Sequence, residues 1–110
     1  MTKGVGILVE FENKFLLLKR KDTGIWEPCK GHLEINESYE EAIKRELFEE
    51  TSIENSSSPE KIGELTFSFI SKKTNKKKTR EIKYYHVKVY TSKVILSDEH
   101  TNYLGLEKEI

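Results

Sequence analysis

The order of hydrophobic and polar positions predicts several strands interrupted by one helix. Four segments have the aliphatic runs or the apolar–polar alternation of strands: residues 5–11, 14–19, 62–70 and 81–90. Residues 12–13 form a polar turn of hairpin length between the first two. Residues 71–80 are expected to be a loop. Residues 27–32 are expected to be another, because Pro28 and Gly31 interrupt regular strand pairing.

Residues 39–51 are expected to form the helix. Ser38 is a good N-cap, and Glu41 three residues later completes the capping-box pattern. Ser52 stands where the helix is expected to end; a left-handed serine would cost roughly 1 kcal/mol, unless the helix ends by another route. At about 100° per residue, one helix face carries four apolar side chains: Tyr39, Ala42, Ile43 and Leu47. Residues 101–110 are expected to form a short helical tail.

Three carboxylates share this helix with the apolar stripe. Glu46 and Glu50 fall inside the stripe, and Glu49 lies at its edge. An ionised carboxylate is very costly to bury unless something compensates its charge. Converging carboxylates therefore indicate a hard divalent cation, with magnesium first and manganese as a substitute, which takes oxygen ligands and commonly bridges substrate phosphates. The alternative is an amphipathic helix with a solvated acidic face, which does not explain carboxylates within the stripe.

Length and composition indicate one small domain. A chain of 110 residues can bury a modest core. Acidic and basic residues balance at 19 each, so no global field draws the protein to nucleic acid or membrane. A single cysteine, Cys29, excludes an internal disulfide framework and favours a reducing compartment, so a cytoplasmic location is expected. The apolar runs are too short to span a bilayer, and no signal peptide is recognised.

The spacing of the charged residues resembles the Nudix box, Gly-x5-Glu-x7-Arg-Glu-aliphatic-x-Glu-Glu-x-Gly-aliphatic. The matching residues, within 31–53, are Gly31, Glu37, Arg45, Glu46, Leu47, Glu49, Glu50 and Ile53. Ser52 replaces the second glycine. The resemblance implies a single Nudix domain over residues 1–110. Its class would be α+β, an α/β/α sandwich around a mixed sheet, with a shortened C-terminal helix.

The resemblance also implies roles for the box residues. Glu49 and Glu50 are the expected metal ligands. Glu46 is either a further ligand or the base that takes a proton from water. Arg45 and Glu37 are expected to pair so that the carboxylates are correctly aimed. For Arg45 alone, a solvated surface position is the alternative.

The segments flanking the box resemble asymmetrical diadenosine tetraphosphate hydrolases. Residues 26–32 are similar to that subfamily's Trp-x-Pro-Pro-Lys-Gly-His, with Cys29 in place of the second proline, and residues 97–103 are similar to its Ser-x-Glu-His-x-x-Tyr. The likeness covers most of the chain. It implies cleavage of diadenosine tetraphosphate into ATP and AMP.

This likeness assigns further candidates. Lys30 and His32 would contact the polyphosphate, and the backbone carbonyl of Lys30 or of the next glycine could complete the metal sphere. Glu99 is a candidate extra metal ligand. Tyr84 and Tyr103 could stack on adenine. Each has a plainer alternative: an ordinary loop lysine and histidine, a solvated acidic turn residue, and two core tyrosines.

Residues 72–80 hold six of the 19 basic residues. Such a segment could bind a tetraphosphate electrostatically, or equally the 5′-triphosphate end of an RNA. It could also be a solvated loop that only keeps a sheet edge soluble.

The leading hypothesis from the sequence is thus a magnesium-dependent Nudix hydrolase of dinucleoside polyphosphates. Removal of pyrophosphate from RNA 5′ ends or from nucleoside triphosphates is the alternative within enzymes. A catalytically weak Nudix module that binds nucleotides is the alternative outside them. A homodimer is expected to cover the sheet face that the short C-terminus leaves open.

Overall fold

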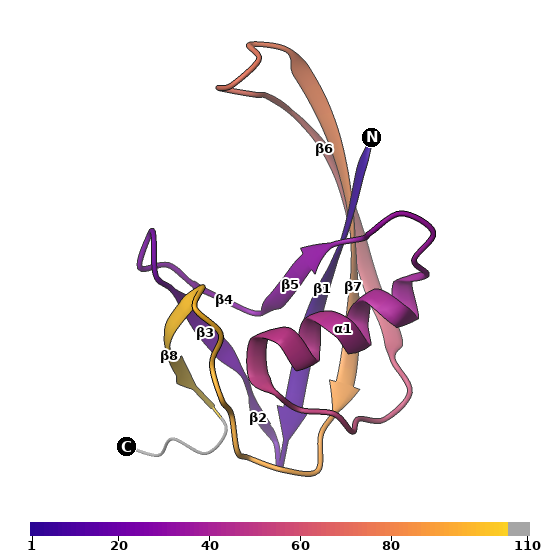
Figure 1. Cartoon of the computed structure of the whole chain (residues 1–110). Helices are drawn as coiled ribbons and strands as arrows, with labels where there is room; N and C mark the ends of the chain where they lie inside the picture. Colours follow the sequence, from indigo (N-terminus) through magenta and orange to yellow (C-terminus); the bar gives the residue numbers. More distant parts are fainter. Residues whose placement is uncertain (106–110) are drawn as a thin grey trace.

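The computed structural model describes residues 1–105, which contain one helix and eight strands (Figure 1). In chain order these are β1 (Thr2–Phe11), β2 (Lys14–Phe15), β3 (Leu17–Arg20), β4 (Trp26–Glu27), β5 (Cys29–His32), α1 (Tyr39–Thr51), β6 (Glu60–Ile70), β7 (Lys77–Lys88) and β8 (His100–Leu104).

The strands form two sheets, and the larger one is mixed. Its order is β2-β1-β7-β6. β2 pairs with residues 10–11 of β1, and β5 pairs with residues 4–7 of the same strand. β1 and β7 run parallel, whereas the other pairs are antiparallel. The smaller sheet has the order β4-β3-β8. One helix against a mixed sheet confirms the expected α+β class.

Helix α1 covers one face of the larger sheet (Figure 1). Alternate side chains of β1, those of Val5, Ile7 and Val9, are fully buried in the core that α1 shares. The intervening Gly4 and Gly6 leave the first half of the other face of β1 with little side-chain cover from β1 itself. These buried side chains of β1 pack against the apolar side chains of α1. The helix therefore lies against β1 and β5, and its carboxylates lie over these two strands.

The predicted helix and its start are confirmed. The Ser38 side chain accepts a hydrogen bond from the backbone N–H of Glu41 (3.1 Å), and the Glu41 carboxylate accepts one from the backbone N–H of Ser38 (2.9 Å). At the other end Ser52 is left-handed, with φ 65°, and its N–H donates to the carbonyl of Phe48 (2.8 Å). The strained serine expected from the sequence is therefore present.

The loop expected over residues 27–32 is largely strand. Cys29–His32 pairs with β1, with Lys30 opposite Gly6 and Gly31 opposite Val5. Pro28 falls between β4 and β5, outside both ladders. Since the edge of β1 offers free backbone groups, pairing satisfies them and overrides the local signal of proline and glycine.

Two more expectations are wrong in part. Lys77–Arg80, expected within a loop, begins β7, because the register of the hairpin with β6 continues to Ile70 opposite Lys77. Residues 101–104, expected as helix, belong to β8 and pair with β3. The rest of the expected helical tail, residues 106–110, lies outside the described residues.

Within residues 1–105, no helix covers the second face of the larger sheet, so the second layer of the expected α/β/α sandwich is not seen there. Apolar side chains remain exposed on β6, with exposed fractions of 50% for Leu65 and 36% for Phe67. Across this same range, no helix has the length and apolar character needed to cross a membrane.

Candidate active site

Arg45 connects the acidic residues of the box. Its guanidinium contacts both carboxylate oxygens of Glu37 (2.7 and 2.9 Å) and one oxygen each of Glu46 and Glu49 (2.7 Å each). It also donates to the backbone carbonyl of His32 (2.8 Å). The hydrogen bonds from Arg45, ahead of a backbone contact, lower the pKa of Glu37 from 4.5 to about 2. The spacing of the motif thus brings four charged side chains together, and Arg45 is not a solvated surface residue.

Glu50 is the most perturbed carboxylate. It is buried, and its Oε1 accepts a hydrogen bond from the backbone N–H of Lys30 (3.2 Å). Burial, then the negative charge of Glu46, raises the pKa of Glu50 from 4.5 to about 8. Burial also raises the pKa of Glu46, although Arg45 opposes the shift. Gly31 makes room for this arrangement, because a Cβ there would overlap the Glu46 carboxyl group.

Glu99 belongs to the same electrostatic group. It precedes β8, and its negative charge contributes to the raised pKa values of Glu46 and Glu50.

Burial, followed by the charge of Glu50, raises the pKa of the Cys29 thiol well above its usual value, so this thiol stays protonated. The oxygens rather than the sulfur are therefore the available ligands.

The chemistry of these donors fits a hard divalent cation. The buried Glu50 and the partly buried Glu46 have raised pKa values because burial and neighbouring negative charges disfavour ionisation, and a cation would compensate those charges. Over residues 1–105, no three acidic, histidine or cysteine side chains are close enough to form a complete ligand set. One reason is that Arg45 holds one oxygen of Glu46 and one of Glu49.

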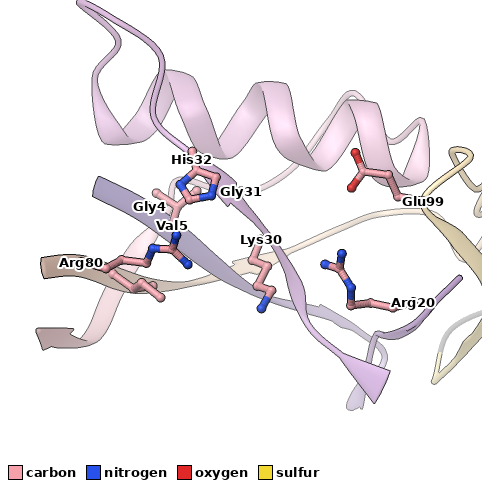
Figure 2. Close-up of a pocket in the computed structure, with 9 residues that line it drawn as sticks. Gly4, Val5, Arg20, Lys30, Gly31, His32, Arg80 and Glu99 are labelled. Carbon is pink, nitrogen blue, oxygen red and sulfur yellow. The ribbon is translucent and has the colours of Figure 1, made fainter. Parts of the chain in front are cut away.

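A cavity of about 260 Å³ opens at β5, where Lys30, Gly31 and His32 line it, and Glu99 is its acidic lining residue. Basic and acidic side chains from four segments line it (Figure 2): Arg20, Lys30, His32, Arg80 and Glu99. Burial, then the positive charges of Arg80 and Lys30, lowers the pKa of His32. Arg80 Nε is buried without a hydrogen-bond partner. A cavity with these donors suits an anion such as a phosphate group.

Sequence reasoning missed Glu27, which joins β4, β3 and β8. Its buried carboxylate contacts Lys30 Nζ (3.2 Å), Arg20 Nη1 (3.4 Å) and His100 Nε2 (3.1 Å). It also missed the roles of Arg20 and Arg80. A signal was present, because the chain has only three arginines and the third is Arg45.

Neither predicted stacking tyrosine lines this cavity in the described part of the chain. Tyr84 lies on β7 with its ring directly over Gly6, on the open sheet face. Tyr103 is partly buried against the core and pairs with Leu18. Base stacking by either residue stays a prediction. Lys30, His32 and Glu99, in contrast, do lie at the cavity.

Comparisons with known proteins agree with this geometry. The sequence model of the NUDIX domain matches residues 1–106. A MutT-like protein of Streptomyces ambofaciens is 40% identical over 48 residues, which are 44% of this chain and 31% of that relative's length. The matched segment thus spans about a third of the curated relative.

Three solved structures share the fold. A Caenorhabditis elegans Ap4A hydrolase complex is 27% identical over 97% of this chain and 80% of its own, with a TM-score of 0.72. The MutT protein of Methanosarcina mazei Go1 is 25% identical over 96% of this chain and 75% of its own, with a TM-score of 0.73. The Escherichia coli dihydroneopterin triphosphate pyrophosphohydrolase, 17% identical over 96% and 80%, has a TM-score of 0.79 and supports the fold alone.

Proposed function

The chain belongs to the Nudix hydrolase family, and from this premise we propose that it is a magnesium-dependent hydrolase of dinucleoside polyphosphates that splits diadenosine tetraphosphate into ATP and AMP. The observation that carries this proposal is that one strand serves two purposes: in β5, Lys30 and Gly31 line the cationic cavity, while their backbone contacts the carboxylates of Glu50 and Glu46 on α1. A polyphosphate requires positive charge along its length and a metal at the bond that breaks.

The residues divide this work between them. We assign Glu49 and Glu50 as the residues that would hold magnesium, with Glu99 as a candidate further ligand. When bound, magnesium neutralises phosphate charge and acidifies water. Two roles stay open for Glu46: a further ligand, or the base that takes a proton from the attacking water. Arg45 and Glu37 keep the carboxylates aimed, which is the role of residues behind metal ligands.

The cavity holds the rest of the phosphate chain. Arg20, Lys30 and Arg80 supply positive charge, and His32 supplies a ring nitrogen at the same wall. Arginine pairs with phosphate through two parallel N–H groups, which fixes orientation as well as affinity. Glu27 keeps Lys30 and Arg20 in place on the side away from the substrate.

Product analysis tests this function. Diadenosine tetraphosphate is incubated with the protein and magnesium, with a chelator as control, and products are resolved by chromatography. We expect ATP and AMP in equal amounts, only with the metal. Glu50→Gln should lower turnover by orders of magnitude, whereas Glu40→Gln, an exposed acid on the same helix, should not. Two ADP molecules per substrate, or no turnover, would refute the assignment. The absence of turnover together with tight nucleotide binding would favour a catalytically weak module.

A second candidate substrate is the triphosphate at the 5′ end of RNA. It is favoured by the basic β6–β7 hairpin, which carries five lysines between residues 72 and 78, beyond the cavity. Comparing turnover of the dinucleotide, a nucleoside triphosphate and a triphosphorylated RNA at fixed magnesium discriminates between these substrates.

We also place the protein in the cytoplasm, where the free thiol of Cys29 stays reduced. The predicted homodimer is tested by light scattering at micromolar concentration.

A further inference from the structure

The β6–β7 hairpin extends beyond the rest of the molecule, with its tip far from α1 (Figure 1). From Leu65 to Arg80 the sequence contains no acidic residue and six basic ones: Lys72, Lys73, Lys76, Lys77, Lys78 and Arg80. The five lysines are exposed, and none of them lines the cavity. A positive charge of about six on so short a hairpin makes a strong local field despite the neutral net charge of the chain.

One face of this hairpin is aromatic as well as basic. Phe67 pairs with Arg80 and Phe69 with Lys78, so these four side chains share a face of the sheet. The two phenyl rings lie 6.1 Å apart, and the Arg80 guanidinium lies 5.2 Å from the centre of the Phe69 ring. Phe67 remains 36% exposed and the neighbouring Leu65 50% exposed. Aromatic rings beside basic groups form the usual platform for single-stranded nucleic acids.

Arg80 makes this platform continuous with the cavity. It lines the cavity together with Lys30 and His32 (Figure 2), and it also packs on Phe69. Its buried Nε has no partner, so a donor is available at the junction. A polymer whose terminal phosphates entered the cavity could leave it past Arg80 and continue along the hairpin.

We propose that the face of the β6–β7 hairpin formed by Phe67, Phe69, Lys78 and Arg80, with the lysines at its tip, is a binding surface for single-stranded RNA. RNA chains begin with a nucleoside triphosphate, so RNA presents a phosphoanhydride at the end of a flexible polyanion. The entry of that end into the cavity rests on the proposed function, with the RNA 5′ end as its second candidate substrate. Binding of the RNA body to the hairpin does not, and it is measured separately.

Charge favours RNA over a second copy of the chain as occupant of this surface. A two-fold interface centred on the hairpin would bring two sets of six basic residues together, and like charges repel. A polyanion instead gains attraction from the same residues and releases its counterions. The exposed aromatic rings then stack on bases rather than pack against another copy.

The first test measures binding without catalysis. A labelled, 5′-hydroxyl, single-stranded RNA of about ten nucleotides is titrated by fluorescence anisotropy, in chelator, with the full-length protein. The variant Lys72→Ala/Lys73→Ala/Lys76→Ala removes lysines at the tip of the hairpin. The control Lys44→Ala/Lys88→Ala/Lys93→Ala removes three exposed lysines away from that tip, on α1, at the far end of β7 and after β7. We expect the hairpin variant to bind about tenfold or more weakly, with a salt dependence reduced by roughly two in log–log slope. The control should retain both.

The second test separates stacking from charge. Phe67→Leu keeps an apolar side chain but removes the ring, and Phe48→Leu makes the same change on an exposed position of α1. Only the first should weaken RNA binding, by about tenfold. Hydrolysis of diadenosine tetraphosphate is measured with each variant.

Three results would overturn the proposal. One is RNA binding unchanged in both hairpin variants. Another is an equal loss with RNA and with the dinucleotide, which would assign the lysines to the phosphate chain. The third is a dimer that dissociates in the Phe67→Leu variant, which would assign the face to a second copy. Failure of hydrolysis with intact RNA binding would refute the proposed function alone.

Discussion

Replacing Glu50 by glutamine should stabilise the metal-free protein while removing its response to metal. The carboxyl group is buried and close to the charges of Glu46 and Glu99, which raise its pKa together with burial. Glutamine has nearly the same shape, carries no charge, and can still accept the hydrogen bond from the Lys30 N–H. The change therefore removes the cost of ionisation and leaves the packing in place.

The sign and size follow from the raised pKa. The pKa of Glu50 is about 8 in the folded protein and 4.5 in the unfolded chain. Between these two pH values the folded protein keeps the proton and the unfolded chain has lost it. The free energy of unfolding therefore has its full value below pH 4.5 and falls as the pH rises towards 8. At 1.4 kcal/mol per pH unit, the loss at pH 7 is roughly 3 kcal/mol. Glu50→Gln should escape that loss.

Urea denaturation in chelator, at pH 4.5 and at pH 7.5, measures this difference. Glu50→Gln and the wild type should be similar in stability at the lower pH, and the variant should be more stable by about 4 kcal/mol at the higher pH. Saturating magnesium should then stabilise the wild type and not the variant, because a ligand that binds only the folded state stabilises it, by an amount that rises with the logarithm of its concentration over Kd. A difference between the two proteins that does not change with pH would refute the reasoning.

Three further changes test other parts of the structure. Gly31→Ala places a methyl group where the Glu46 carboxyl group lies and should lower kcat at least tenfold. The control Gly63→Ala, where a Cβ meets nothing within 4 Å, should leave kcat unchanged. Equal rates in the two variants would count against the close contact. Ser52→Gly relieves a left-handed serine and should raise the free energy of unfolding by about 1 kcal/mol in urea, without a change in kcat. Glu27→Gln removes a carboxylate shared by three side chains and should lower that free energy by about 2 kcal/mol; an unchanged urea midpoint would disprove this role.

The helix and its chemistry could be predicted because their signals are local. The capping residues, the apolar stripe and the acidic positions all lie within one short segment, where the helical period decides which side chains share a face. The contact of Arg45 with Glu49 follows from their i,i+4 spacing on the helix, and its pairing with Glu37 was expected from the Nudix box. The left-handed end at Ser52 was expected because the Nudix box has a glycine at this position.

Strands that form by pairing with distant partners could not be predicted. Cys29–His32 is strand because β1 has a free edge, and His100–Leu104 is strand because β3 does. Neither edge is visible in the local sequence, where Pro28 indicates a loop. Pairing with remote residues can override such preferences.

The same limit applies to the cavity. Arg20 on β3 and Arg80 on β7 come from strands far apart in the sequence, and they line one cavity only in the folded chain. A lysine-rich chain with three arginines, all at the candidate site, offered the one sequence clue to this arrangement.

Calorimetric titration of the purified protein with magnesium, repeated with manganese, tests most directly whether the carboxylates of α1 bind a divalent cation. Performed at pH 7 in two buffers of different ionisation enthalpy, it should show saturable binding with release of about one proton, because Glu50 must ionise to become a ligand. Glu50→Gln should show neither. If the wild type takes up no cation, even with a nucleotide present, the proposed metal site and its hydrolytic role are contradicted.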